Sequence, residues 1–317
     1  MIEHKLILEL YTGLCYYLIH IYMLSENQEM VQDFRISHYP ADNILPLYTY
    51  CEDIPCLIFQ YMENGSLYQK LQDAKRPLTW KQRANIATGI ARGLYHLHAN
   101  NVVHCRINSR KVLLDKYLEP KITGSSTNRL LYNESGVIVN HINVPSMNGT
   151  PYYLPNWYIA HQQGKIVRKQ IDVYSFGIVL LEIMSGMVPA YKSKDPCHKT
   201  LRDFVNNDIL NHCEPESEYV APDDEDKRHF NITTMSYANG AQETVTRDAD
   251  WAKIMFDIGR QCTVYDQTPW RAPFKDPEPW KTMQEHNITM EKIYQTLEAC
   301  YEWYQIHLGL QFQEANT

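Results

Sequence analysis

The segment that decides the fold reads Val102-Val103-His104-Cys105-Arg106-Ile107-Asn108-Ser109-Arg110-Lys111-Val112-Leu113-Leu114-Asp115. Apolar stretches at its two ends form a hydrophobic frame, and a mostly polar loop lies between them. The loop contains three lysine or arginine residues and no acidic residue before Asp115. The frame predicts a segment that is held in the core of a domain, and the loop residues limit the chemistry that it can perform.

Helical periodicity flanks this loop on both sides. Residues 80–98 carry apolar side chains at helical spacing and lead directly into the loop. Residues 172–186 are apolar nearly all round, which is typical of a helix buried in the centre of a domain, and Gly186 is suited to end it. Further helices are predicted at 251–262 and 289–307.

The first 62 residues favour a small sheet. Residues 6–24 are rich in apolar and aromatic side chains, and we expect a buried strand pair there rather than a signal or membrane segment, because no small-residue cleavage site follows. Strands are also predicted at 43–48 and 56–62, with a helix at 25–37 before them and a turn at Asn64-Gly65 after them.

The composition excludes several classes of protein. With 317 residues, of which 44% are hydrophobic, the chain can bury a substantial core. A formal charge of -7 leaves no basic footprint, so no nucleic acid is expected as a partner. Eight cysteines without a C-x-x-C pair predict reduced thiols. Without a targeting signal, a cytoplasmic location and no membrane insertion are expected.

Taken in order, these segments resemble the eukaryotic protein kinase fold, and within it the Pelle and interleukin-1-receptor-associated kinase group. Residues 57–67 look like the hinge of that group, and residues 102–115 look like its catalytic loop. The segments 118–122, 149–155 and 172–186 also match. The likeness covers about residues 17–300, apart from a polar insertion.

The resemblance implies an α+β fold with two lobes. A small, β-rich N-lobe is expected at residues 1–62, and whether it is truncated stays open. A larger, mainly α-helical C-lobe is expected at 63–300, with the polar insertion at about 192–250 and a C-terminal tail at 301–317.

The catalytic loop departs from the family pattern at each position that carries chemistry. Arg106 stands where the family has the aspartate that accepts the substrate proton. Asn108 replaces the lysine that steadies the phosphate, and Lys111 replaces the asparagine that binds the second magnesium ion. A guanidinium cannot act as a base at physiological pH, and an ammonium group repels a divalent cation.

Two more positions are altered outside the loop. Gly124 stands where the resemblance implies the metal-binding aspartate, and Tyr22 stands where it implies the phosphate-pairing lysine. A glycine-rich phosphate loop is also missing, since Gly13 is the only glycine before Gly65. No cofactor is therefore expected, and the binding of ATP and magnesium is not expected either.

Other positions of the family pattern are retained. His104 and Asp172 match positions that tie the catalytic loop to the central helix, and we interpret both as structural. The resemblance places Phe59 at the gatekeeper position and the remains of a nucleotide cleft near Phe59, Tyr61, Met62 and Leu113. A nucleophile formed by His104 and Cys105 is disfavoured, because no orienting acid is apparent.

The expected function is that of a pseudokinase, a catalytically inactive kinase-like scaffold or regulator. The resemblance suggests innate immune signalling of the Toll type, with signalling proteins bound through the lobe surfaces. The chain has no room for the death domain that this group usually carries, so recruitment through such a domain is not expected. The alternative is an atypical Ser/Thr kinase that retains ATP binding and phosphotransfer, with Asp115 as the nearest acid.

Overall fold

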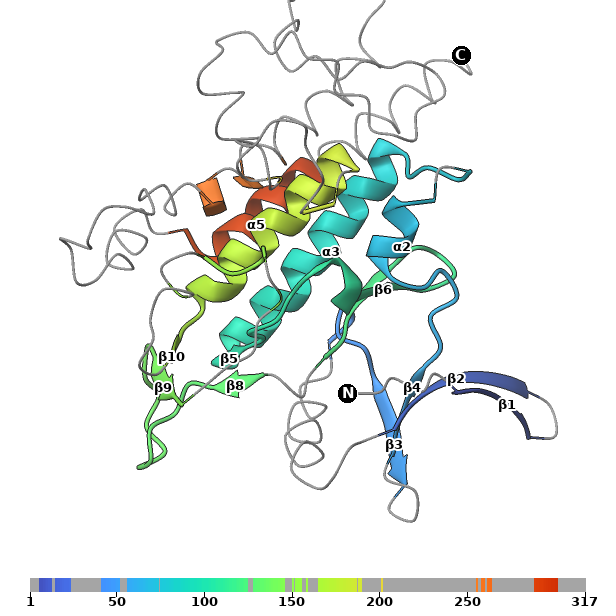
Figure 1. Cartoon of the computed structure of the whole chain (residues 1–317), viewed down its shortest axis with the longest axis horizontal. Coiled ribbons are helices and arrows are strands. Elements are labelled where there is room, and N and C mark those ends of the chain that lie inside the picture. Colours follow the sequence, from blue (N-terminus) through green and yellow to red (C-terminus); the bar gives the residue numbers. More distant parts are fainter. Residues whose placement is uncertain are drawn as a thin grey trace, which may run out of the picture.

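The described part of the chain consists of a small sheet and a larger helical body (Figure 1). The computed structural model describes residues 6–12, 15–23, 41–51, 56–73, 75–124, 128–145, 150, 152–155, 158, 165–186, 188–189, 201, 255, 258–259, 261–263 and 288–301. The predicted helix at 25–37, almost all of the polar insertion at 192–250 and the tail beyond residue 301 lie outside the described residues.

Four strands form an antiparallel sheet in the order β1-β2-β4-β3. They are β1 (Leu6–Thr12), β2 (Cys15–Met23), β3 (Leu47–Cys51) and β4 (Cys56–Gln60). The predicted pairing of strands within 6–24 is confirmed as the hairpin of β1 and β2, and the burial predicted for this pair lies outside what the structure describes. The strand predicted at 43–48 was wrong in its bounds, because β3 begins only after Pro46, which has no N–H to donate to a ladder.

A tight turn joins the sheet to the helices. Gly65 has a φ of +68°, and its N–H donates to the carbonyl of Met62 over 3.1 Å, so the predicted turn at Asn64-Gly65 is confirmed. Helix α2 (Leu67–Leu71) follows at once. Ser66 caps it, since its hydroxyl accepts from the Gln69 N–H while the Gln69 side chain accepts from the Ser66 N–H.

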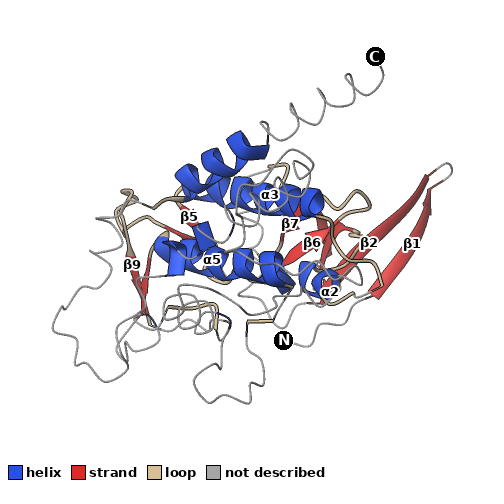
Figure 2. Cartoon of the chain, turned by 90° about the horizontal axis from the view of Figure 1, so that it is seen from above, coloured by secondary structure: helices blue, strands red, loops and turns tan. Residues whose placement is uncertain are grey.

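Two long helices, α3 (Trp80–Ala99) and α5 (Gln170–Ser185), lie side by side in both views of the chain (Figures 1 and 2). A capping box of Thr79 and Gln82 begins α3. Gly186, with a φ of +70°, ends α5 in the left-handed conformation that glycine favours. The two predicted helices are therefore confirmed, with bounds that differ by one or two residues.

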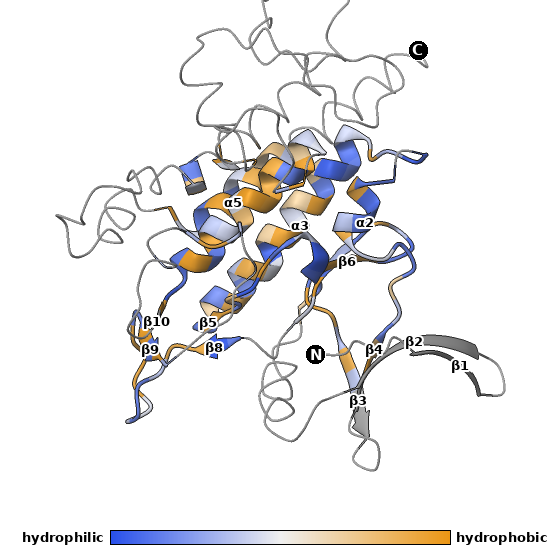
Figure 3. Cartoon of the chain, in the orientation of Figure 1, coloured by the Kyte–Doolittle hydropathy of each residue, from blue (hydrophilic) through white to orange (hydrophobic). Residues whose placement is uncertain are grey.

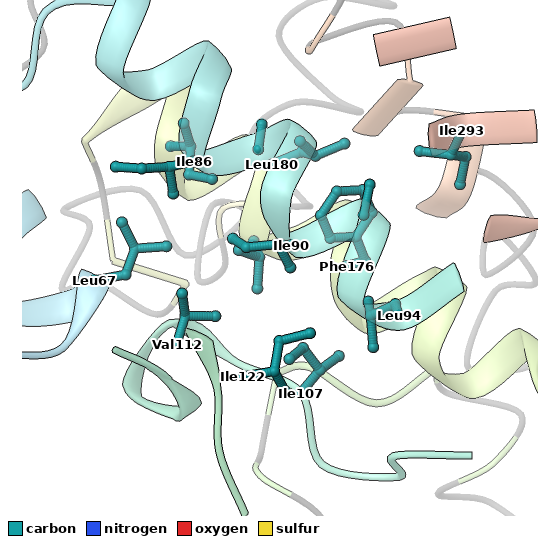
Figure 4. Packing of buried hydrophobic residues seen from close by; sticks show 14 of the residues in the cluster. Leu67, Ile86, Ile90, Leu94, Ile107, Val112, Ile122, Phe176, Leu180 and Ile293 are labelled. Atoms are coloured by element: carbon teal, nitrogen blue, oxygen red, sulfur yellow. The ribbon is translucent and has the colours of Figure 1, made fainter. Parts of the chain in front are cut away.

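The core lies mainly between these helices. Every residue of α5 from Ile171 to Ser185 is buried, and Figure 3 shows apolar residues along the length of this helix. Figure 4 shows Ile90 and Leu94 of α3 next to Phe176 of α5 in one continuous cluster. The predicted C-terminal helices are confirmed where they are described, because residues 258–259, 261–263 and 290–301 are helical.

Six short strands lie before and after the polar loop, which connects β5 to β6. They are β5 (Val102–Val103), β6 (Val112–Leu114), β7 (Pro120–Ile122), β8 (Arg129–Leu130), β9 (Ile142–Val144) and β10 (Lys165–Val167). They pair as β5 with β8, β6 with β7 and β9 with β10. The short 3-10 helix η1 (Ser109–Lys111) leads from the loop into β6. Among the described residues, no helix is long and apolar enough to span a membrane.

Candidate functional site

The loop after β5 is fastened to α5 by one buried carboxylate. Oδ2 of Asp172 accepts a hydrogen bond from the N–H of His104 over 2.7 Å, and Oδ1 accepts one from the N–H of Cys105 over 2.8 Å. The ring of His98, at the end of α3, lies 3.0 Å from Oδ2. The loop bends sharply here, since Cys105 has a φ of +71°. Asp172 thus connects α3, α5 and the loop.

The ring of His104 connects the loop to the end of β7. Its Nδ1 accepts from the N–H of Arg106 over 3.3 Å, so its Nε2 is the atom that donates to the carbonyl of Thr123, 3.0 Å away. Burial lowers the pKa of His104, Asp172 raises it, and the positive charges of Lys111 and Arg106 lower it further. A neutral imidazole fits both hydrogen bonds.

Asn108 is buried and is engaged in hydrogen bonds within the loop. Its Oδ1 accepts from the N–H of Arg110 over 3.0 Å and so caps η1. Its Nδ2 donates to the carbonyl of Arg106 over 2.9 Å and to the hydroxyl of Thr150 over 3.1 Å. Both ends of the amide therefore hold the loop in shape.

Lys111 lies against Gly124. A Cβ atom added to Gly124 would lie 3.1 Å from Cδ and 3.6 Å from Nζ of Lys111. Gly124 also has a φ of +96°, which disfavours any other residue. The structure thus brings together Arg106, Asn108, Lys111 and Gly124, whereas Tyr22 lies in β2, where it pairs with Leu57.

These residues do not fit a magnesium ion. Magnesium is bound by oxygen atoms, above all those of carboxylates. Lys111, beside Gly124, offers an ammonium group instead, Arg106 offers a guanidinium group, and Gly124 has no side chain. Within the described residues, no group of three His, Cys, Asp or Glu side chains could hold a metal ion.

Three of the four predicted cleft residues pack together. Phe59, Met62 and Leu113 are buried in one apolar cluster with Leu45. Tyr61, the fourth, is half-buried and is not part of this cluster. Three of the residues predicted to line a nucleotide cleft are therefore buried in apolar packing with one another.

Residues 18–243 match the family model described as protein tyrosine and serine/threonine kinase. The match covers more than half of the chain. The chain belongs to this kinase family. The two-lobed kinase fold follows from that membership, and the expected resemblance to kinases is confirmed.

Three relatives are between 33% and 40% identical to this kinase domain over the aligned residues. Pelle-like serine/threonine-protein kinase pik-1 of Caenorhabditis elegans is 40% identical over 50% of this chain and 34% of its own length. Serine/threonine-protein kinase pelle of Drosophila melanogaster is 38% identical over 52% of this chain and 34% of its own length. Interleukin-1 receptor-associated kinase-like 2 of Mus musculus is 33% identical over 53% of this chain and 27% of its own length. The matched region is thus about a third or less of each relative.

The kinase domain contains one buried network that the sequence reasoning missed. Glu182 of α5 accepts hydrogen bonds from the hydroxyl groups of Ser109 and Tyr153, each over 2.8 Å. Burial raises the pKa of Glu182 to about 8, although both donors and the charge of Arg110 act in the opposite direction. Residues 172–186 were interpreted as a buried apolar helix, and the acid at Glu182 was not considered separately. The signal that could have identified it is an acidic residue in an otherwise apolar run.

Asp115, the acid nearest to the loop in the sequence, has a role in a turn of this kinase domain. Its Oδ1 accepts from the N–H of Tyr117 over 2.8 Å and from the N–H of Glu119 over 2.9 Å. Its own carbonyl accepts from Nδ2 of Asn64. These bonds hold the connection between β6 and β7.

Proposed function

We propose that this chain is a pseudokinase, a catalytically inactive member of the kinase family that acts by binding other proteins. The observation that carries the proposal is the contact between Lys111 and Gly124. These two residues stand where the family pattern has its metal ligands, and they supply a positive charge and no oxygen ligand. Arg106, at the position of the base, cannot accept a proton at physiological pH.

The way in which the loop is held supports a structural role. The carboxylate of Asp172 accepts the N–H groups of His104 and Cys105, so the loop keeps its shape without catalytic residues. Asn108 uses both ends of its amide within the domain. Such a loop stabilises the helical body and performs no phosphoryl transfer, which needs charge neutralisation and positioning of the phosphate.

A protein-binding role is supported by exposed apolar side chains. Tyr132 and Ile138 pair across a turn and, with Val137, expose large apolar groups between β8 and β9. We propose that signalling proteins bind such surfaces of the lobes in the cytoplasm. The likeness to serine/threonine-protein kinase pelle and to interleukin-1 receptor-associated kinase-like 2 supports a role in signalling. The pathway that we propose is an innate immune one of the Toll type.

A transfer assay tests the loss of catalysis. The purified chain is incubated with radiolabelled ATP, magnesium and casein, next to an active protein kinase as the positive control. We expect no label in casein or in the chain above a heat-denatured control. The alternative, an atypical Ser/Thr kinase, predicts transfer that disappears in Asp115→Asn, and the hydrogen bonds of that side chain to two N–H groups do not favour it.

A further inference from the structure

Two cysteines occupy partner positions in the hairpin of β3 and β4. Cys51 is the last residue of β3 and Cys56 is the first residue of β4, and the antiparallel register pairs one with the other. Residues 52–55 connect them along the chain. The spacing C-x-x-x-x-C is not one that predicts a bond by itself, so the pairing of these cysteines becomes apparent only from the strand register.

Partner positions in antiparallel strands meet the distance requirement of a disulfide bond. Directly opposite residues have Cα atoms about 4.5 Å or about 5.5 Å apart, depending on whether they exchange hydrogen bonds. Disulfide bonds span Cα distances of about 4.4–6.8 Å. Both kinds of partner position fall within this range. A bond between Cys51 and Cys56 is therefore compatible with the register of the two strands as it stands.

The strand that such a bond would fasten lies at an edge of the four-stranded sheet (Figure 1). In the described sheet, β3 follows β4 as the last strand of the order. The ladder between them is irregular, because the register shifts between Leu47 and Thr49. A bulge disrupts the hydrogen bonds of a ladder, and an edge strand has a neighbour on one side only, so such strands open more easily than central ones.

Apolar packing holds the opposite end of this hairpin. Leu47 is the register partner of Phe59 and packs against the buried cluster that contains Phe59 and Leu113. Leu113 belongs to β6, so this end of the hairpin is attached to the helical body. A covalent bond between Cys51 and Cys56 would secure the end next to residues 52–55.

We propose that Cys51 and Cys56 form a reversible, redox-sensitive disulfide bond that fastens the edge strand β3 to β4. The oxidant is a small-molecule disulfide such as glutathione disulfide. One cysteine thiolate attacks it, which forms a mixed disulfide and releases one glutathione thiolate, and the second cysteine thiolate then displaces the other. The two cysteines lose two electrons and two protons in total, which end in two molecules of reduced glutathione. Excess thiol reverses the reaction.

This proposal concerns the sheet and is independent of the proposed loss of catalysis. It agrees with the expectation of reduced thiols, because both cysteines stay reduced wherever reduced glutathione dominates. Disulfide bonds that respond to the surrounding thiol pool are the labile, regulatory ones. Oxidation of this pair would hold the edge of the sheet closed, and reduction would release it.

Peptide mapping after equilibration in glutathione buffers tests the bond. The tryptic peptide of residues 36–70 contains Cys51 and Cys56 and no other cysteine. The full chain is equilibrated at rising ratios of oxidised to reduced glutathione, alkylated with iodoacetamide and digested. We expect the peptide to change from a form with two alkylated thiols to a form with none, lighter than the dithiol by two hydrogen atoms. Dithiothreitol should restore the first form.

The same titration in concentrated urea shows whether the fold favours the bond. A disulfide bond that stabilises the fold is itself stabilised by the fold to the same extent. The folded chain should therefore form the bond at a ratio of oxidised to reduced glutathione about tenfold lower than the unfolded chain, or lower still. An equal ratio would overturn the proposal. So would a peptide that keeps two alkylated thiols, or carries glutathione on one cysteine, at every ratio.

Serine variants give a second readout with a matched control. Oxidation should raise the unfolding midpoint of the wild type by about 2 °C or more, and Cys51→Ser should lose this rise. Cys300→Ser, which removes a half-buried free thiol of the C-terminal helix, should keep it. Cys56→Ser takes the place of Cys51→Ser if the latter does not fold. A rise that persists without Cys51 or Cys56 would assign the effect to other thiols and contradict the proposal.

Discussion

Asp172 has no exposed surface, and both of its oxygen atoms accept hydrogen bonds from the backbone of the loop. A carboxylate is suited to this place because it offers acceptors on two sides and needs no donor of its own. The ring of His98 adds a third partner from α3. One residue thereby fixes the path of the loop relative to two helices.

Replacing this carboxylate by an amide should destabilise the domain. In Asp172→Asn, one oxygen becomes an NH₂ group that faces a backbone N–H at His104 or Cys105. We expect the free energy of unfolding to fall by about 3 kcal/mol, as for a buried hydrogen-bonded charge that loses a partner. Urea denaturation measures this, with the exposed Asp42→Asn as the control. A loss no larger than that of the control would contradict the anchoring role.

Glu182 should make the stability depend on pH. Its pKa is raised from 4.5 to about 8 in the folded state by burial, so the folded state binds more protons than the unfolded state between these values. Its contribution to stability is therefore full below pH 4.5 and is lost as the pH rises to about 8, by at most about 1.4 kcal/mol per pH unit. Ser109 and Tyr153 donate to it throughout.

The measurement compares urea unfolding of the wild type and Glu182→Gln at pH 5, 6, 7 and 8. The stability of the wild type minus that of the variant should fall steadily over this range. The exposed Glu291→Gln serves as a control for the loss of one acid. A difference that stays constant with pH would show that Glu182 is charged in the folded domain at every pH tested.

Among single residues, the sequence allowed prediction of those that belong to a short local motif. Arg106, Asn108 and Lys111 were singled out from one continuous pattern and Gly124 from a second motif, and the structure places Lys111 beside Gly124. The network of Ser109, Tyr153 and Glu182 was missed, because its members are up to 73 positions apart and no periodicity connects them. Contacts of this kind depend on the three-dimensional packing.

Long elements with a strong periodic signal were predicted well. Helices α3 and α5 extend over the expected residues because their apolar positions, caps and final glycine agree with each other. Strand β3 was misplaced because the residues before it are also apolar. Ile44 forms an isolated bridge to Ile122, and Leu45 packs with Phe59 instead of continuing the strand.

Helix α3 packs so closely on its neighbours that a methyl group on its contact face should be harmful. A Cβ added to Gly89 would lie 2.5 Å from Cγ of Pro120 in β7 and 2.8 Å from Nδ2 of Asn43. Alanine gains about 1 kcal/mol in helix propensity, but overpacking costs about 1–3 kcal/mol and the ring of Pro120 is rigid. We therefore expect Gly89→Ala to lower the free energy of unfolding by up to about 2 kcal/mol.

Chemical denaturation of Gly89→Ala and Gly136→Ala separates crowding from backbone strain. No atom of the described residues lies within 4 Å of a Cβ at Gly136, but φ there is +73°, so that variant should lose about 1 kcal/mol through strain alone. Trimming Pro120 to alanine in the Gly89→Ala background should then recover stability. A stabilised Gly89→Ala would mean that α3 and β7 are less tightly packed than described.

Over the whole molecule, the positions that differ from the family's catalytic pattern lie in separate elements of the fold. Tyr22 lies in β2, Arg106 in the loop after β5, Lys111 in η1 and Gly124 after β7. Family membership follows from features spread over the chain, such as the order of strands and helices, and these survive. Catalysis depends on a few groups that must act together. A chain can thus keep the fold of its family while the residues at the catalytic positions change.

The spread of these positions over several elements predicts what single substitutions toward the family pattern will do. Single reversions toward the family pattern, Tyr22→Lys, Arg106→Asp, Lys111→Asn and Gly124→Asp, should each leave phosphate transfer undetectable, because members of a catalytic set act as a unit. Gly124→Asp should also lose about 1–2 kcal/mol of stability, since φ is +96° at this position.

Transfer of radiolabelled phosphate to casein, with an active kinase in parallel, measures the first effect, and urea unfolding measures the second. Lys116→Asn provides the matched change outside the site. Transfer restored by one reversion alone would mean that the other groups had been replaced elsewhere in the chain. In that case, the positive charge around Gly124 would be compatible with catalysis after all, and the atypical kinase would become the better description.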